Sequence, residues 1–77
     1  MPRLTPLPWR TLDCILALLG YRFMRQRGSH RIYYGNELER PIVLPAYQGV
    51  GVPIIKNIID TAGITREQFF DLLKECK

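Results

Sequence analysis

Apolar residues in the first part of the chain repeat with the period of a helix. One set is spaced i, i+3, i+4 and i+7, consisting of Leu12, Ile15, Leu16 and Leu19. Residues at this spacing lie on one face of an α-helix. Pro8 suits the first turn of such a helix, and Gly20 is a natural left-handed stop after it. The pattern therefore predicts an amphipathic helix that ends at Gly20.

The middle of the chain has the short aromatic and β-branched runs that are typical of strands. These runs cover residues 21–26, 31–34 and 40–44, and they are separated by Gly28-Ser29 and by residues 35–39. Glycine and polar residues between such runs favour turns. The pattern predicts a three-stranded antiparallel meander.

A second helix is predicted to begin at Pro53 and to end at Gly63. The same i, i+3, i+4, i+7 spacing recurs in Ile55, Ile58, Ile59 and Ala62. Proline in the first turn and glycine after the last are the usual helix boundaries.

The last helix has the clearest start signal in the chain. Residues 65–68 read Thr-Arg-Glu-Gln, which is a capping box with Gln68 at the third helical position. Ile64 and Phe69 are placed to form the hydrophobic staple around it. The buried stripe of this helix is predicted to contain Phe69, Leu72, Leu73 and Cys76.

The order of elements predicts an α+β fold. It is α-β-β-β-α with one extra short helix, and no connection requires a parallel strand. Helices stacked on one face of an antiparallel sheet leave the other face and the hairpin end open to solvent or a partner. We expect a single domain over residues 1–77.

Composition indicates a soluble, cytoplasmic protein. No apolar run approaches the roughly 20 residues needed to span a bilayer, and there is no signal peptide pattern. The two cysteines, Cys14 and Cys76, are too far apart in sequence to suggest a metal site. Without a secretion signal, reduced thiols are favoured over a disulfide.

Charge is concentrated in one segment. Residues 22–31 contain four arginines and no acid, while the other 7 of 11 basic residues balance the 7 acidic ones. The only histidine, His30, lies in this segment between aromatic residues. The segment is therefore a candidate for binding a phosphate backbone.

The residues around His30 fit the chemistry of RNA cleavage. Imidazole can take a proton near neutral pH, and RNA supplies its own nucleophile, the 2′-hydroxyl. Arg25, Arg27 and Arg31 could stabilise charge that builds on the phosphate. In the turn, Gly28 permits close backbone approach and Ser29 offers a hydroxyl.

Other interpretations stay open. The arginines could form a solvated hairpin face. His30 could be a core histidine, because it has the same strand parity as Ile32 and Tyr34. With no second histidine, the general acid would be Tyr33, Tyr47, Lys56 or water. The acidic residues are dispersed, so neither a metal nor another cofactor is expected.

Three stretches of the chain resemble the HicA toxin family. They are residues 20–33, which contain the R-Q-x-G-S-H element, residues 43–45 and residues 58–64. The resemblance covers nearly the whole chain from Pro8 to Leu73. It implies a double-stranded-RNA-binding-domain-like sandwich and an mRNA interferase of a type II toxin–antitoxin pair. It also implies His30 as the catalytic residue and a HicB antitoxin that covers the active face.

The chain departs from the family pattern at two places. Many members have a V-P-x-H motif after the third strand, where this chain has Tyr47 in the histidine position. In the following loop, only Lys56 keeps a cation where members have a polar, lysine-containing segment. We therefore expect this loop to bind RNA more weakly than in a typical member.

These observations favour a toxin endoribonuclease with His30 as its catalytic base. The predicted RNA contacts are Arg25, Arg27, Gly28, Ser29, Arg31 and Lys56, and Tyr33 and Tyr47 are auxiliary candidates. Two alternatives are a non-catalytic RNA-binding module and a protein-binding domain whose basic hairpin meets an acidic partner.

Overall fold

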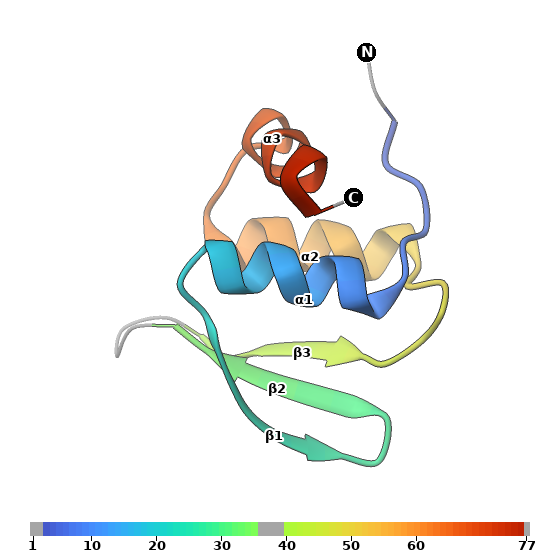
Figure 1. Cartoon of the computed structure of the whole chain (residues 1–77), viewed down its shortest axis with the longest axis vertical. Coiled ribbons are helices and arrows are strands. Elements are labelled where there is room, and N and C mark those ends of the chain that lie inside the picture. The colour runs from blue at the N-terminus through green and yellow to red at the C-terminus, as the bar shows by residue number, and fades with distance from the viewer. Residues whose placement is uncertain (1–2, 36–39, 77) are drawn as a thin grey trace.

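Helices enclose one side of a small sheet in the computed structural model, which describes residues 3–35 and 40–76 (Figure 1). The elements, in chain order, are α1 (Trp9–Leu18), β1 (Arg22–Arg27), β2 (His30–Tyr34), β3 (Ile42–Pro45), α2 (Val52–Ala62) and α3 (Arg66–Cys76). Of the predicted turn at residues 35–39, residues 36–39 lie outside the described residues.

The sheet is the predicted antiparallel meander, with the strand order β1-β2-β3. Its register contains one irregularity. Phe23 pairs with Tyr33, but the next pair is Arg25 with Ile32, so Met24 has no partner in β2. An extra residue of this kind is a β-bulge, and it changes which side of the sheet the following residues face.

All three helices lie on the same side of the sheet, as predicted (Figure 1). Both α1 and α2 pack against β3, and α3 packs against α1. In Figure 1, α3 lies over α1 and α2 on the side away from the strands. No helix within the described chain is long and apolar enough to cross a membrane.

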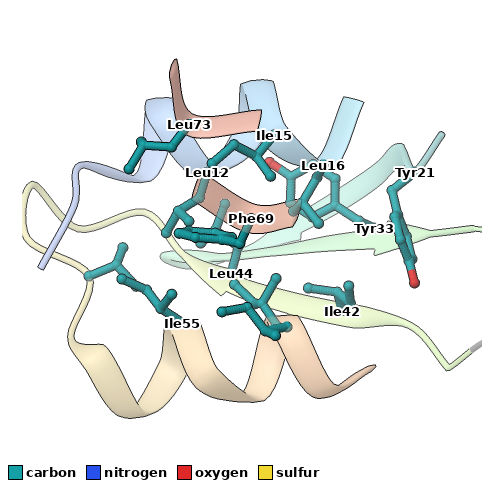
Figure 2. Close-up of a cluster of buried hydrophobic side chains, with 13 residues drawn as sticks. Leu12, Ile15, Leu16, Tyr21, Tyr33, Ile42, Leu44, Ile55, Phe69 and Leu73 are labelled. Atoms are coloured by element: carbon teal, nitrogen blue, oxygen red, sulfur yellow. The ribbon is translucent and has the colours of Figure 1, made fainter. Parts of the chain in front are cut away.

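The core lies between the sheet and the helices (Figure 2). The predicted stripes supply it: Leu12, Ile15 and Leu16 from α1, Ile55, Ile58 and Ile59 from α2, and Phe69 and Leu73 from α3. Phe69 is fully buried and points into the middle of the cluster (Figure 2). The outer members of the stripes, such as Leu19 and Leu72, are only partly buried.

The helix ends follow the predicted signals. Gly20 and Gly63 have φ angles of 91° and 70°, so both adopt the left-handed conformation that favours glycine after a helix. The capping box forms at α3. The Gln68 backbone N–H donates to Thr65 Oγ1 at 3.1 Å, and the Thr65 N–H donates to Gln68 Oε1 at 2.8 Å.

The expectation of reduced thiols is wrong for this structure. Cys14 of α1 and Cys76 of α3 form a disulfide, with a Cα–Cα distance of 5.8 Å. The cause is the packing of α3 on α1, which brings the last turn of one helix beside the middle of the other. Sixty-two residues separate the two cysteines, so the bond links the first and last helices of the fold.

Reducing this bond should lower the stability of the fold substantially. A cross-link that closes a loop of this length is worth about 4 kcal/mol in the chain-entropy model, because it restricts the unfolded chain. We expect the urea unfolding midpoint of the wild type to fall when a reductant is added. Cys14→Ser is the control and should unfold at the same midpoint with and without reductant. Identical midpoints for oxidised and reduced wild type would contradict the prediction.

Candidate nucleic-acid interface at the hairpin end

His30 is the first residue of β2 and lies on the side of the sheet away from the core. It pairs with Arg27 of β1 and with Pro45 of β3. Its side chain is exposed, whereas Tyr33, which has the opposite parity, is 2% exposed. The alternative of a core histidine is therefore wrong. An exposed imidazole at the end of the sheet is accessible to a ligand.

The two-residue turn before His30 is built on Gly28. Its φ of 59° falls in the left-handed region, and a positive φ at the first central residue is the pattern of a type II′ hairpin turn. Gln26 Nε2 donates a hydrogen bond of 2.9 Å to the Gly28 carbonyl oxygen. Apart from Gly28 and its two chain neighbours, no heavy atom of the described residues would lie within 4 Å of a Cβ added there, so the backbone of the turn is open to approach.

Backbone hydrogen bonds bring Tyr47 to the same end of the molecule. The Ala46 N–H donates to the Ser29 carbonyl oxygen at 2.6 Å, which fixes the end of β3 to the turn. The Trp9 N–H donates to the Tyr47 carbonyl oxygen at 3.0 Å, which fixes the following loop to the start of α1. Tyr47 itself is about half exposed and lies two residues after the strand partner of His30.

The predicted arginines fall on two different sides of the sheet. Arg25 and Arg27 pair with Ile32 and His30, so they share the open side with His30, and both are exposed. Arg31 pairs with Gln26 of β1 and with the buried Leu44 of β3, so it faces the helices.

Arg31 is held by contacts within the protein. Its guanidinium lies 4.1 Å from the centre of the Phe23 ring and 4.5 Å from that of Trp9. Its Nε donates to Tyr33 Oη at 2.8 Å, its Nη1 donates to Gln26 Oε1 at 3.1 Å, and its Nη2 lies 3.6 Å from Asp13 Oδ1. The side chain is only 16% exposed. Its predicted role as a phosphate contact stays a prediction, and the contacts observed are structural.

Tyr33 is part of the same network. Its hydroxyl donates to Asp13 Oδ1. The pKa of Tyr33 is raised to about 12, and burial is the largest cause. The hydrogen bond to Asp13 also raises this pKa, while the hydrogen bond from Arg31 lowers it. The phenol is therefore neutral over the physiological range and faces the helices. Of the two auxiliary tyrosines, Tyr47 is the one on the surface.

Lys56 lies on α2, on the helix side of the sheet. It lines an open depression of about 370 Å³ together with Ile59 and Asp60 of the same helix and Arg66 of α3. The structure thus groups His30, Ser29, Gly28, Arg25 and Arg27 at the hairpin and leaves Lys56 on another element. Within the described residues, no three His, Cys, Asp or Glu side chains are grouped so that they could hold a metal ion.

Three residues of the network were not anticipated from the sequence: Trp9, Asp13 and Gln26. A signal for Asp13 does exist, because it is the only acid in α1 and borders the apolar stripe, next to Leu12. A partly buried acid gains from a cationic partner, and the arginine-rich hairpin is the richest source of cations in the sequence.

Comparison with known families identifies the chain. Residues 9–64 of its 77 residues match the model described as the HicA toxin of bacterial toxin–antitoxin systems. The chain belongs to the HicA toxin family. Searches among curated proteins and solved structures give no match.

The matched range runs from the first residue of α1 to the residue just before the α3 capping box. It contains the whole hairpin, His30 and the Arg31 network, and α3 with Cys76 follows it. Membership of the HicA family also implies a partner, the antitoxin of the pair.

Replacing Arg31 should destabilise this HicA protein. Arg31→Ala removes two ring contacts and two hydrogen bonds from a charged donor, so we expect a loss of about 2–3 kcal/mol in the free energy of unfolding. Arg31→Lys keeps the charge but not the planar stacking. Its free energy of unfolding should therefore lie between those of the wild type and Arg31→Ala. Chemical denaturation would measure both.

The matched control is Arg25→Ala, an exposed arginine on the same hairpin. Its effect should stay within about 0.5 kcal/mol. Equal effects of Arg25→Ala and Arg31→Ala would show that the network does not distinguish the two sides of the sheet.

The raised pKa of Tyr33 predicts a stability difference that depends on pH. The unfolded phenol ionises near pH 10 and the folded one near 12. Stability from this group is therefore complete below pH 10 and is lost between pH 10 and 12. We expect Tyr33→Phe to be less stable than wild type at pH 8, with a smaller difference at pH 11. A difference in urea midpoint that is the same at both pH values would contradict this assignment.

Proposed function

We propose that this HicA protein is an endoribonuclease that cleaves mRNA with His30 as its catalytic base. The observation that supports the proposal is the arrangement of the open side of the hairpin. The only histidine of the chain is exposed beside Arg27, its strand partner, and Arg25 lies on the same side. A proton acceptor next to phosphate-binding cations is what cleavage by the RNA's own 2′-hydroxyl requires.

The first step is proton transfer from the 2′-hydroxyl to the neutral imidazole of His30. The 2′-oxygen then attacks the adjacent phosphorus, and the bond from phosphorus to the 5′-oxygen of the next nucleotide breaks. Arg25 and Arg27 bind the non-bridging oxygens, where negative charge builds in the transition state. Gly28 and Ser29 form the turn between Arg27 and His30, and their open backbone and hydroxyl complete the proposed phosphate site.

The leaving 5′-oxygen must receive a proton. Tyr47 is the auxiliary candidate that the structure supports, because hydrogen bonds hold its loop to the turn and to α1. The proton comes from the Tyr47 hydroxyl or from water. Tyr33 faces the core and keeps its proton, so its part is to support the strand.

The partner proposed for this toxin is a HicB-type antitoxin that covers the hairpin end. The exposed arginines and the open turn make this end suitable for an acidic or closely fitting protein surface. Both mRNA and antitoxin would be met in the cytoplasm. The second candidate function, a non-catalytic RNA-binding module, would use the same arginines without proton transfer by His30.

Substituting His30 should abolish toxicity and leave RNA binding in place. We expect induction of the wild type without its antitoxin to arrest growth and to fragment mRNA. His30→Ala should grow normally, and the purified variant should cleave RNA at least about 100-fold more slowly, the usual contribution of a general base. Growth curves, RNA electrophoresis and single-turnover cleavage rates measure these effects.

A matched control is Tyr33→Phe, which removes a hydroxyl from the same strand but on the core side. It should keep cleavage activity at temperatures where it is folded. Equal arrest by wild type and His30→Ala would remove His30 from catalysis. Arrest by neither, together with retained RNA binding, would favour the non-catalytic module.

A further inference from the structure

The side of the sheet away from the helices carries exposed side chains on all three strands, well beyond His30. The register assigns its members: Arg22, Arg25 and Arg27 on β1, His30, Ile32 and Tyr34 on β2, and Val43 on β3. We call this set the open face. Figure 1 shows that no helix formed by residues 3–35 and 40–76 covers this side of the sheet.

The charges of the open face lie in one row. Three arginines follow β1, which is an edge strand, and at about 3.3 Å per residue they extend for roughly 16 Å from Arg27 to Arg22. The described strands contain no acidic residue, so no carboxylate from the sheet neutralises this row. His30 stands at one end of the row, beside Arg27.

Apolar and aromatic side chains lie next to the arginines. Ile32 pairs with Arg25 and Val43, and Tyr34 pairs with Arg22 at the end far from His30. Val43 is 47% exposed and Tyr34 40%. These side chains offer apolar surface to a ligand beside the row of arginines.

A row of cations beside a flat apolar strip matches the chemistry of single-stranded RNA. The phosphates of one strand can follow the arginines while its bases lie on Ile32, Val43 and the Tyr34 ring. A duplex keeps its base faces stacked inside, and so it could use only the arginines. The apolar half of the open face would then stay exposed, which favours a single strand as the ligand.

We infer that the open face binds an extended single-stranded RNA that runs from the cleavage position at His30 to Arg22 and Tyr34. Arg22 binds a phosphate and Tyr34 stacks on a base several nucleotides from the bond that is cut. The inference rests on the proposed function for the identity of the ligand as RNA. It adds a binding site whose distal contacts are Arg22 and Tyr34. It also adds a preference for single-stranded over double-stranded RNA, which the cleavage chemistry alone does not require.

The test is the affinity of the full-length protein for a short fluorescent RNA with 2′-deoxy substitutions, which cannot be cleaved. Fluorescence anisotropy would compare this strand with the same strand annealed to its complement, for wild type, Arg22→Ala and Tyr34→Ala. We expect the single strand to bind at least tenfold more tightly than the duplex. Arg22→Ala should weaken binding about tenfold and reduce the slope of log affinity against log salt by about 0.7. Tyr34→Ala should weaken binding about tenfold with no change in slope.

Lys74→Ala is the matched control, because Lys74 is an exposed cation on α3, and it should bind RNA like the wild type. Both test residues are exposed, and unchanged melting temperatures would show that the variants are folded. The inference is overturned if the duplex binds as well as the single strand, or if Arg22→Ala and Tyr34→Ala bind RNA like the wild type. Loss of antitoxin binding by these two variants with unchanged RNA binding would assign the face to a protein partner and overturn it as well.

The two proposals can fail separately. Binding by the open face without cleavage of unmodified RNA by the wild type would refute the proposed nuclease and leave the inference standing. If cleavage depends on His30 but Arg22→Ala and Tyr34→Ala do not change the affinity for RNA, the inference is refuted and the proposed nuclease stands.

Discussion

The guanidinium of Arg31, stacked between the rings of Trp9 and Phe23, is the contact on which the arrangement of this protein depends. It lies where α1 meets the hairpin. Its hydrogen bonds reach Gln26 in β1 and Tyr33 in β2, and Asp13 of α1 is its ion-pair partner. Gln26 in turn binds the carbonyl of Gly28 in the turn. One side chain thus connects the first helix, two strands and the turn that precedes His30.

This network explains how a small domain can present an exposed histidine in a defined position. The hairpin extends beyond the core, and β1 has no buried residue. Packing alone would leave such a strand weakly held. A partly buried cation that contacts three acceptors supplies the missing constraint. Any displacement of the hairpin from α1 would separate Asp13 from both Arg31 and Tyr33. As a result, Arg31, one of the four hairpin arginines, is engaged in contacts within the protein.

The helices and the sheet could be predicted from sequence because their signals are local. The spacing of Leu12, Ile15 and Leu16 and the capping box at Thr65 each lie within a few turns of chain. The disulfide could not be predicted, because the approach of Cys14 to Cys76 depends on how α3 packs on α1, sixty-two residues away. The usual link between disulfides and secretion gave the wrong answer here.

The roles of the arginines were hidden by the bulge at Met24. Phe23, Arg25 and Arg27 have the same parity, so simple alternation would place all three on one side of the sheet. The shift in register sends Phe23 to the helices and the two arginines to the open side. Phe23 is then free to stack on Arg31, while Arg25 and Arg27 join His30. A single extra residue therefore creates both the structural network and the basic surface from one short strand.

The division of these residues between the two sides of the sheet limits the chemistry that the site can perform. The side of the sheet that faces α1 holds Tyr33, whose pKa is raised and whose hydroxyl donates a hydrogen bond to the Asp13 carboxylate. Proton exchange with a ligand is therefore suppressed on that side. The open side holds the only imidazole of the chain and exposed cations. In the proposed function, acid–base catalysis and phosphate binding are therefore confined to the open side. The loop of Tyr47 is held to the turn by the Ala46 N–H and to α1 by the Trp9 N–H. Trp9 thus supports the site twice, with its ring against Arg31 and with its N–H on the loop that presents Tyr47.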